Sequence, residues 1–160
     1  MEDFDSPALR SLIDQFGSDV KHTHADHGDA TALVDPARLY AVIEFLRDEA
    51  EFDMLTDVTA VDYLGETPRF EVVYHFYSTT QTRRVRIKAR VSEEVAEVAS
   101  ACDLFASANW MEREVFDLYG IRFADHPDLR RILLYEEFEG HPLRKDYPKE
   151  KRQPLVGPRN

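Results

Sequence analysis

The chain has 160 residues, of which 43% are apolar and 32% charged, a composition typical of one folded domain with a hydrophobic core. Its formal net charge of −11 argues against nonspecific nucleic-acid binding, because no dominant basic surface is present to displace counterions. Acids outnumber bases in residues 1–60, whereas bases outnumber acids in residues 149–160, so we expect separate partner surfaces.

The single cysteine, Cys102, excludes an intrachain disulfide. It also excludes an iron–sulfur cluster held by this chain alone, since a cluster needs about four thiolates. The N-terminal sequence lacks the basic-then-apolar order of a secretory signal, and no apolar run approaches the roughly 18 residues of a membrane helix. We therefore expect a cytoplasmic protein that associates with a membrane only through a partner.

Two helices are predicted in the first third of the chain. The first begins with a serine cap at Ser6 followed by proline, carries one apolar stripe, and ends at Gly17. The second begins with the same cap-and-proline pattern at Asp35 and runs to about Asp48.

Strand patterns surround and follow these helices. Residues 21–24 and 31–34 are expected to form a short strand pair, and residues 54–63 are rich in β-branched types. Apolar and polar residues then alternate in 70–76 and 84–91, which a short polar connection joins as an antiparallel hairpin. The pattern predicts an α+β fold, with a mixed or antiparallel sheet and helices packed mainly on one face.

A third helix is predicted from about Asp103 to Tyr119, ended by Gly120. Its apolar residues form one stripe, but Trp110 lies on the polar side of the helix. A tryptophan there indicates a second contact surface.

Regular structure is hard to sustain after Gly120, because prolines and glycines interrupt the chain repeatedly. The segment is nevertheless too apolar to remain free in solution. We therefore predict a domain at residues 1–120 and an extended partner-binding arm at residues 121–160.

Two groups of residues have the types, but not a recognisable spacing, of a metal site. A solvated loop is the simpler interpretation of the first group, and bonds to backbone or an interface are the simpler interpretation of the second. The first group is His22, Asp26 and Asp29 with His24 and His27, and the second is Asp125, His126, Asp128 and His141.

Three acids, Glu112, Glu114 and Asp117, lie within six helical residues and deserve consideration as an acid–base pair. Arg113 lies four residues before Asp117 and is expected to pair with it on the surface. A salt-bridged helix face is favoured over catalysis.

Two sets of basic residues have different expected roles. The strand residues Arg84, Arg86, Lys88 and Arg90 are interpreted as a solvated sheet face or one that meets an acidic partner. Apolar and acidic residues border the second set, as is typical of buried interface anchors. This second set is Arg130, Arg131, Arg144 and Lys145.

Residues 112–121 (EREVFDLYGI) and 126–133 (HPDLRRIL) resemble the signature of the 30 kDa subunit family of respiratory complex I. Residues 139–148 (EGHPLRKDYP) resemble the C-terminal motif of that family, and residues 61–63 and 108–110 are also similar to it. In bacteria this family is the C subunit of NADH:quinone oxidoreductase. The histidine-rich loop at 22–27 is not a feature we associate with it.

The resemblance implies a structural and assembly subunit of the peripheral arm, on the cytoplasmic side of the bacterial inner membrane. It implies no cofactor on this chain, because FMN and the iron–sulfur clusters belong to partner subunits of the complex. The implied partners are the 49 kDa-type quinone-site subunit, the subunit holding the terminal cluster, and other peripheral-arm subunits. The whole complex transfers electrons from NADH to quinone and translocates protons.

The interface expected from this resemblance combines the third helix with the arm. No catalytic, cofactor-binding or metal-binding residue is expected. The predicted interface residues are Trp110, Glu112, Arg113, Glu114, Phe116, Asp117, Tyr119, His126, Arg130, Arg131, His141, Arg144, Lys145, Asp146 and Tyr147.

Two alternatives remain at this point. One is the equivalent subunit of a related membrane-bound [NiFe] hydrogenase, or of a quinone or coenzyme F420 dehydrogenase complex. The other is a free-standing enzyme that uses Glu112, Glu114, His126 or His141, which requires a pocket with strongly shifted pKa values.

Overall fold

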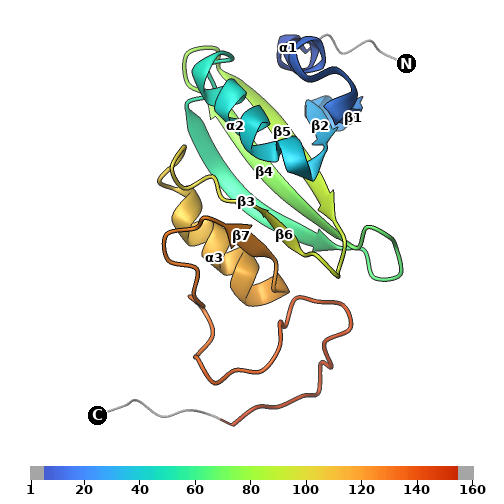
Figure 1. Cartoon of the computed structure of the whole chain (residues 1–160), viewed down its shortest axis with the longest axis vertical. Coiled ribbons are helices and arrows are strands. Elements are labelled where there is room, and N and C mark those ends of the chain that lie inside the picture. The colour runs from blue at the N-terminus through green and yellow to red at the C-terminus, as the bar shows by residue number, and fades with distance from the viewer. Residues whose placement is uncertain (1–5, 155–160) are drawn as a thin grey trace.

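The chain builds one five-stranded mixed sheet, three α-helices and a separate pair of short strands, followed by an arm without regular structure (Figure 1). This computed structural model describes residues 6–154. The elements in chain order are α1 (Pro7–Phe16), β1 (Val20–His24), β2 (Thr31–Val34), α2 (Leu39–Asp48), β3 (Met54–Asp62), β4 (Phe70–Ser78), β5 (Arg83–Val91), β6 (Glu97–Ala99), α3 (Ala108–Tyr119) and β7 (Arg122–Ala124).

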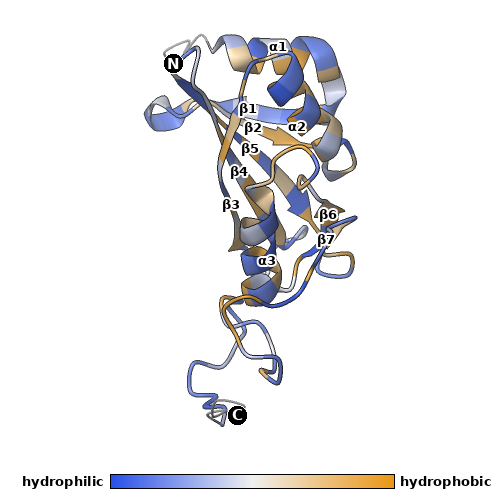
Figure 2. Cartoon of the chain, turned by 90° about the vertical axis from the view of Figure 1, so that its left-hand side faces the viewer, coloured by the Kyte–Doolittle hydropathy of each residue, from blue (hydrophilic) through white to orange (hydrophobic). Residues whose placement is uncertain are grey.

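The large sheet has the strand order β1-β2-β5-β4-β3. All neighbouring strands are antiparallel except β2 and β5, which run parallel and so make the sheet mixed. The alternation of apolar and polar residues along β4 and β5 explains why the helices pack on one face of the sheet. One face of β4 and β5 is apolar and buried, and helices cover it, whereas the opposite face is polar (Figures 1 and 2). The predicted α+β fold is therefore confirmed.

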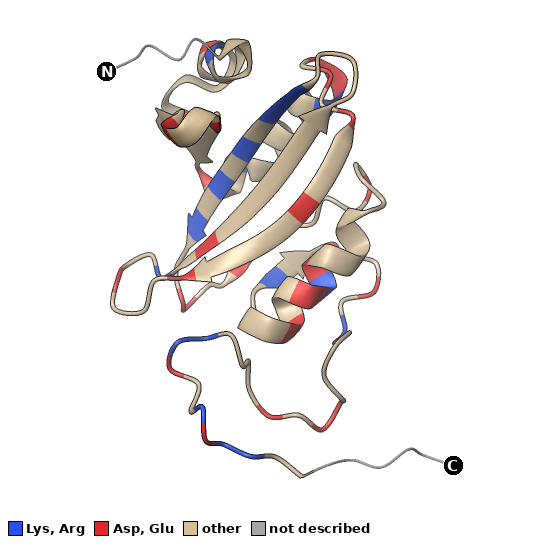
Figure 3. Ribbon diagram, turned by 180° about the vertical axis from the view of Figure 1, so that it is seen from behind, with Lys and Arg blue, Asp and Glu red and all other residues tan. Residues whose placement is uncertain are grey.

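The basic residues of β5 lie on the open face of the sheet (Figure 3). Three of them form ion pairs within the chain: Arg86 with Asp29 at 2.8 Å, Lys88 with Glu71 at 3.0 Å and Arg90 with Glu66 at 2.8 Å. Much of this basic stripe is thus neutralised internally.

The helix starts follow the sequence signals. The Ser6 side chain accepts a hydrogen bond from the Leu9 amide and caps α1, as predicted. Asp35 caps a short 3-10 turn at Pro36–Arg38, which precedes α2 instead of forming its first turn. α3 begins at Ala108, five residues later than expected, because the turn before it bonds to the large sheet. Ser107 donates to the carbonyl of Leu55 in β3.

The parallel pair of β6 and β7 was not predicted. It places Ile121 and Phe123 in the core, where both side chains are buried. A domain boundary after residue 120 would cut this pair apart, so the expected boundary is corrected to a point beyond Ala124. The signal was weak because each strand has only three residues.

Within residues 6–154, no helix is both long and apolar enough to cross a lipid bilayer.

Candidate partner-binding site

α3 faces the sheet on one side and the arm on the other. The indole of Trp110 is 63% exposed, and the Arg113 guanidinium lies 5.3 Å from its ring centroid. Trp110 therefore points away from the core, as the sequence predicts.

Glu112 lies on the opposite side of α3 and is fully buried, so its assignment to a partner surface is corrected. Its carboxylate accepts a hydrogen bond of 2.7 Å from the Ala101 amide and one of 2.6 Å from the Ser100 hydroxyl. Burial raises the pKa of this carboxyl, although these donors and the neighbouring Cys102 oppose the shift. Glu112 thus holds the segment before α3 in place.

Cys102, Glu112 and His126 form the one group in residues 6–154 with the composition and closeness of a metal site. The hydrogen bonds of His126 argue against this role. Its Nδ1 accepts from the Asp128 amide at 3.0 Å, so its Nε2 carries the proton, which it donates to the Asn109 carbonyl at 3.1 Å. No lone pair remains on Nε2 for a metal, and burial raises the pKa of Cys102 to about 12.

The other suggested metal groups are not assembled in the described part of the chain. His126 faces Asn109, whereas His141 Nδ1 donates to the Asp117 carbonyl at 2.9 Å. In the histidine-rich loop, His24 pairs with Asp26 at 3.1 Å.

Asp117, near the end of α3, is the main anchor of the arm. It is fully buried, and one of its oxygens accepts hydrogen bonds from the amides of three consecutive arm residues, Ile132, Leu133 and Leu134, at 2.8 to 3.1 Å. Its other oxygen binds Arg131 at 2.8 Å. Burial by itself would raise the pKa of Asp117, but these donors outweigh it and lower that pKa.

This geometry corrects the expected surface pair of Arg113 and Asp117. Arg113 is buried and donates to the carbonyls of Arg130 and Arg131. α3 therefore uses both side chains to bind arm backbone, and neither Asp117 nor Arg113 is free for a neighbouring subunit.

A second anchor joins the arm to the end of the large sheet. The buried Arg69 guanidinium binds Asp62 at 2.8 Å and Asp146 of the arm at 2.9 Å. Asp62 also accepts a hydrogen bond of 2.8 Å from the Lys145 amide. The guanidinium of Arg144 lies 5.0 Å from the Phe70 ring centroid and donates to the Tyr119 carbonyl.

Close packing at Gly120 helps to place this second anchor. Gly120 ends α3 with a φ of +74°, and a Cβ there would lie 2.5 Å from His141 Nε2. Only glycine fits both the left-handed turn and the approach of His141.

The fifteen predicted interface residues thus divide by exposure. Glu112, Arg113 and Asp117 are buried inside the chain, and Arg131 and Arg144 use their guanidinium groups within it. The partly exposed members are Phe116, Tyr119, His126, Arg131, His141, Arg144 and Tyr147, and the exposed members are Trp110, Glu114, Arg130, Lys145 and Asp146.

Sequence reasoning missed Asp62 and Arg69 as anchors. The two residues lie seven positions apart, Asp62 at the end of β3 and Arg69 just before β4, and Arg69 binds both Asp62 and Asp146, far along the chain. No local spacing indicates such a triad. The one usable signal was the similarity of residues 61–63 to the family.

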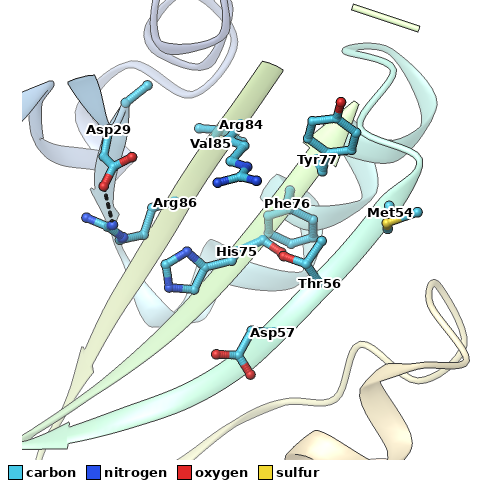
Figure 4. Close-up of a pocket in the computed structure, with 11 residues that line it drawn as sticks. Asp29, Met54, Thr56, Asp57, His75, Phe76, Tyr77, Arg84, Val85 and Arg86 are labelled. Atoms are coloured by element: carbon cyan, nitrogen blue, oxygen red, sulfur yellow. Dashed lines mark hydrogen bonds and ion pairs between the residues drawn. The ribbon is translucent and has the colours of Figure 1, made fainter. Parts of the chain in front are cut away.

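The open face of the sheet contains a pocket of about 550 Å³ (Figure 4). Arg84 and Arg86 line it together with the acids Asp29 and Asp57, and Arg86 is bound to Asp29. His75 is also present, and burial and Arg86 lower its pKa. The pocket thus combines one ion pair with the imidazole of His75.

Comparisons with known proteins identify the family of the chain. Residues 32–153 match the family described as "Respiratory-chain NADH dehydrogenase, 30 Kd subunit". The chain belongs to this family. It is accordingly a subunit of an NADH-quinone oxidoreductase, an oxidoreductase complex.

Two relatives illustrate the similarity. The C subunit of NADH-quinone oxidoreductase from Trichlorobacter lovleyi is 51% identical over 142 residues, which cover 88% of each chain. The protein of the same name from Geotalea uraniireducens is 45% identical over 152 residues, covering 94% of this chain and 93% of the relative.

Two solved structures share the fold. A structure described as "Nqo5 of the trypsin-resistant fragment (1-134)" has a TM-score of 0.66 and 29% identity, covering 76% of this chain and 99% of the fragment. A chain of an archaeal membrane-bound sulfane sulfur reductase has a TM-score of 0.72 and covers 89% of this chain and 84% of its own length. At 21% identity, this second likeness concerns the fold alone.

Proposed function

We propose that the chain is a cofactor-free assembly subunit of the peripheral arm of proton-translocating NADH:quinone oxidoreductase. It supports the subunits that carry electrons from NADH to quinone, without performing a chemical step itself. Its proposed partners are the 49 kDa-type quinone-site subunit and the subunit with the terminal cluster. It lies on the cytoplasmic side of the membrane and associates with that membrane through the complex.

The observation that carries this proposal is the arm anchored by Asp117. Four donors converge on one fully buried carboxylate in order to hold an otherwise irregular segment. The arm extends away from the body of the domain (Figures 1 and 2). A long segment without helix or strand in a compact protein is usually functional, and an exposed, anchored one is suited to binding a neighbour.

The exposed residues of α3 and the arm suit such a contact. Trp110, Leu133 and Leu143 are among the large apolar side chains that remain exposed. Aromatic and apolar anchors of this kind dominate the energetics of protein interfaces. A permanent interface of this kind is expected to bury more than about 2,000 Å² in total.

The test is a pair of truncations in a strain that lacks the native chain. A chain ending at Leu129 keeps β7 and the core, so it is expected to unfold cooperatively but to be missing from the purified complex. A chain ending at Gly120 also loses the buried Ile121 and Phe123, so it is not expected to fold. Calorimetry measures folding, and mass spectrometry of co-purifying subunits measures assembly.

The structure similar to this chain is itself described as a trypsin-resistant fragment, so limited proteolysis of the chain ending at Leu129 is a second measure of its folding. Normal stoichiometry of the chain ending at Leu129 in the complex would show that the arm is not the docking element.

The same co-purification experiment separates the alternative complexes. The sulfane sulfur reductase chain shows that a respiratory complex of another kind contains this fold. Recovery of hydrogenase or F420 dehydrogenase subunits in place of those for NADH oxidation would favour that alternative.

A further inference from the structure

The end of the arm forms a loop that closes on itself. The side-chain amide of Gln153 donates to the Glu139 carbonyl at 2.7 Å, and its oxygen accepts from the Glu139 amide at 2.9 Å. The same side chain also donates to the Tyr147 hydroxyl at 2.9 Å, and Tyr135 donates to the Pro154 carbonyl at 2.9 Å. We call residues 135–153 the closed loop.

Aromatic contacts fill the closed loop. The Phe138 ring lies 5.6 Å from Tyr135 and 6.1 Å from Tyr147, measured between ring centroids. Arg131 lies 5.8 Å from the Phe138 ring and donates to the Gly140 carbonyl at 3.0 Å. These ring contacts and hydrogen bonds give the closed loop a defined conformation.

Gly140 shows how closely the loop is packed. Its φ is +94°, and a Cβ at this position would lie 3.0 Å from the Tyr147 ring. A side chain here would be strained by the backbone conformation and would also press on Tyr147.

The rest of the domain holds the middle of the closed loop but not its end. His141 Nδ1 donates to the Asp117 carbonyl, and the Leu143 amide donates to the Leu118 carbonyl. The two anchors, at Asp117 and at Arg69, fix residues 131–134 and 144–146. Gln153 and Pro154 lie beyond both anchors, and the contacts of Gln153 are all with other arm residues. Lys151 also lies 3.5 Å from the exposed Glu139 carboxylate, and Tyr135 bonds to the Pro154 carbonyl. Loss of the three Gln153 hydrogen bonds would still let the chain after Tyr147 sample more conformations.

We propose that Gln153 is a clasp that preorganises the closed loop as the surface that a neighbouring protein subunit of the complex binds. This inference rests on the proposed function of the arm. A segment ordered before binding loses less conformational entropy when the complex forms, so the clasp strengthens binding without touching the partner. Gln153 acts as a positioning residue.

The test compares Gln153→Ala with Gln81→Ala in the full chain. Gln81 is a matched control, because its amide also bonds to a backbone carbonyl and a surface side chain, but at the far end of the sheet. Gly140→Ala is a second variant, which opens the loop without changing the clasp residue itself.

The first measurement is amide hydrogen exchange of the isolated chain. The Glu139 amide is expected to exchange at least about tenfold faster in Gln153→Ala, because Gln153 is its acceptor. The Leu133 amide, bound to Asp117, is expected to keep its protection. Unchanged exchange at Glu139 would show that the clasp does not form, and would overturn the inference.

The second measurement is retention of the chain in the purified complex during dilution and salt washing. Gln153→Ala and Gly140→Ala are expected to dissociate at least about tenfold faster than the native chain, and Gln81→Ala at the native rate. Native retention of Gln153→Ala, or tighter retention, would overturn the clasp. If the chain ending at Leu129 still failed to assemble in that case, the proposed function would stand and only the clasp would fail.

Discussion

Glu112 shows how far one residue can differ from its appearance in the sequence. It lies between Arg113 and Met111 in a strongly polar stretch, which predicts a solvated helix face. In the structure it is fully buried, because the amide and hydroxyl of the segment before α3 supply donors that replace water. A charged residue can lie in the core when such donors surround it.

The raised pKa of Glu112 has a consequence for stability. The folded state binds the Glu112 proton more tightly than the unfolded state, where the pKa has its ordinary value of 4.5. As pH rises above 4.5 the free energy of unfolding is therefore expected to fall, until Glu112 is ionised in both states. Glu112→Gln, which resembles the protonated acid, is expected to remove this decline in denaturant titrations at several pH values.

The control for this prediction is Glu114→Gln, because Glu114 is exposed on the same helix. Groups that face Glu112, namely Ser100, Cys102 and His126, remain unchanged in both variants. A pH profile of Glu112→Gln that parallels the native one would contradict the assignment.

At the scale of elements, α3 and the arm form one unit that neither could form alone. The arm has almost none of the regular backbone hydrogen bonds that helices and strands form. Its amides therefore need acceptors from other parts of the chain. Asp117 supplies them for three consecutive residues. Its own domain binds the arm at two anchors.

Asp117→Ala tests this unit. Removal of the carboxylate leaves three amides and Arg131 without their acceptor, so we expect the free energy of unfolding to fall by about 3 kcal/mol. The amides of Ile132 to Leu134 are expected to lose protection from hydrogen exchange.

Asp128→Ala is the matched control, because its ion pair with Arg130 is exposed on both sides. It is expected to change stability by less than about 1 kcal/mol. Equal effects of the two substitutions would show that Asp117 does not anchor the arm.

At the scale of the whole molecule, carboxylates hold the arm to the domain at both anchors. Hydrogen bonds from Arg69 lower the pKa values of Asp62 and Asp146, and arm donors lower that of Asp117. A lowered pKa in the folded state stabilises the protein above the ordinary value of 3.8, and this stabilisation is lost as pH falls through the lowered values.

We therefore expect acid to release the arm before the sheet unfolds. Hydrogen exchange measured from about pH 5 to about pH 2, across and below the ordinary value of 3.8, should show loss of protection at Ile132 to Leu134 first, while the strands of the large sheet remain protected. Asp146→Asn should move this release to higher pH. Simultaneous loss of protection in arm and sheet would contradict independent release.

The sequence by itself determined the elements with strong local patterns. The caps at Ser6 and Asp35 and the period-two strands fixed α1, the start of the α2 region and the hairpin of β4 and β5, because these depend on neighbours in the chain. Family membership also followed from sequence, through motifs in α3 and the arm.

Tertiary structure alone decided how those motifs are used. β6 and β7 are too short to signal themselves, and they form because distant segments meet. The charged residues Glu112, Asp117 and Arg69 look like surface residues in sequence, but each has partners brought together by folding. The spacing of apolar residues in a short segment predicts which side chains share a face of a helix or strand. The partners of a buried charge, in contrast, come from residues far away in the chain.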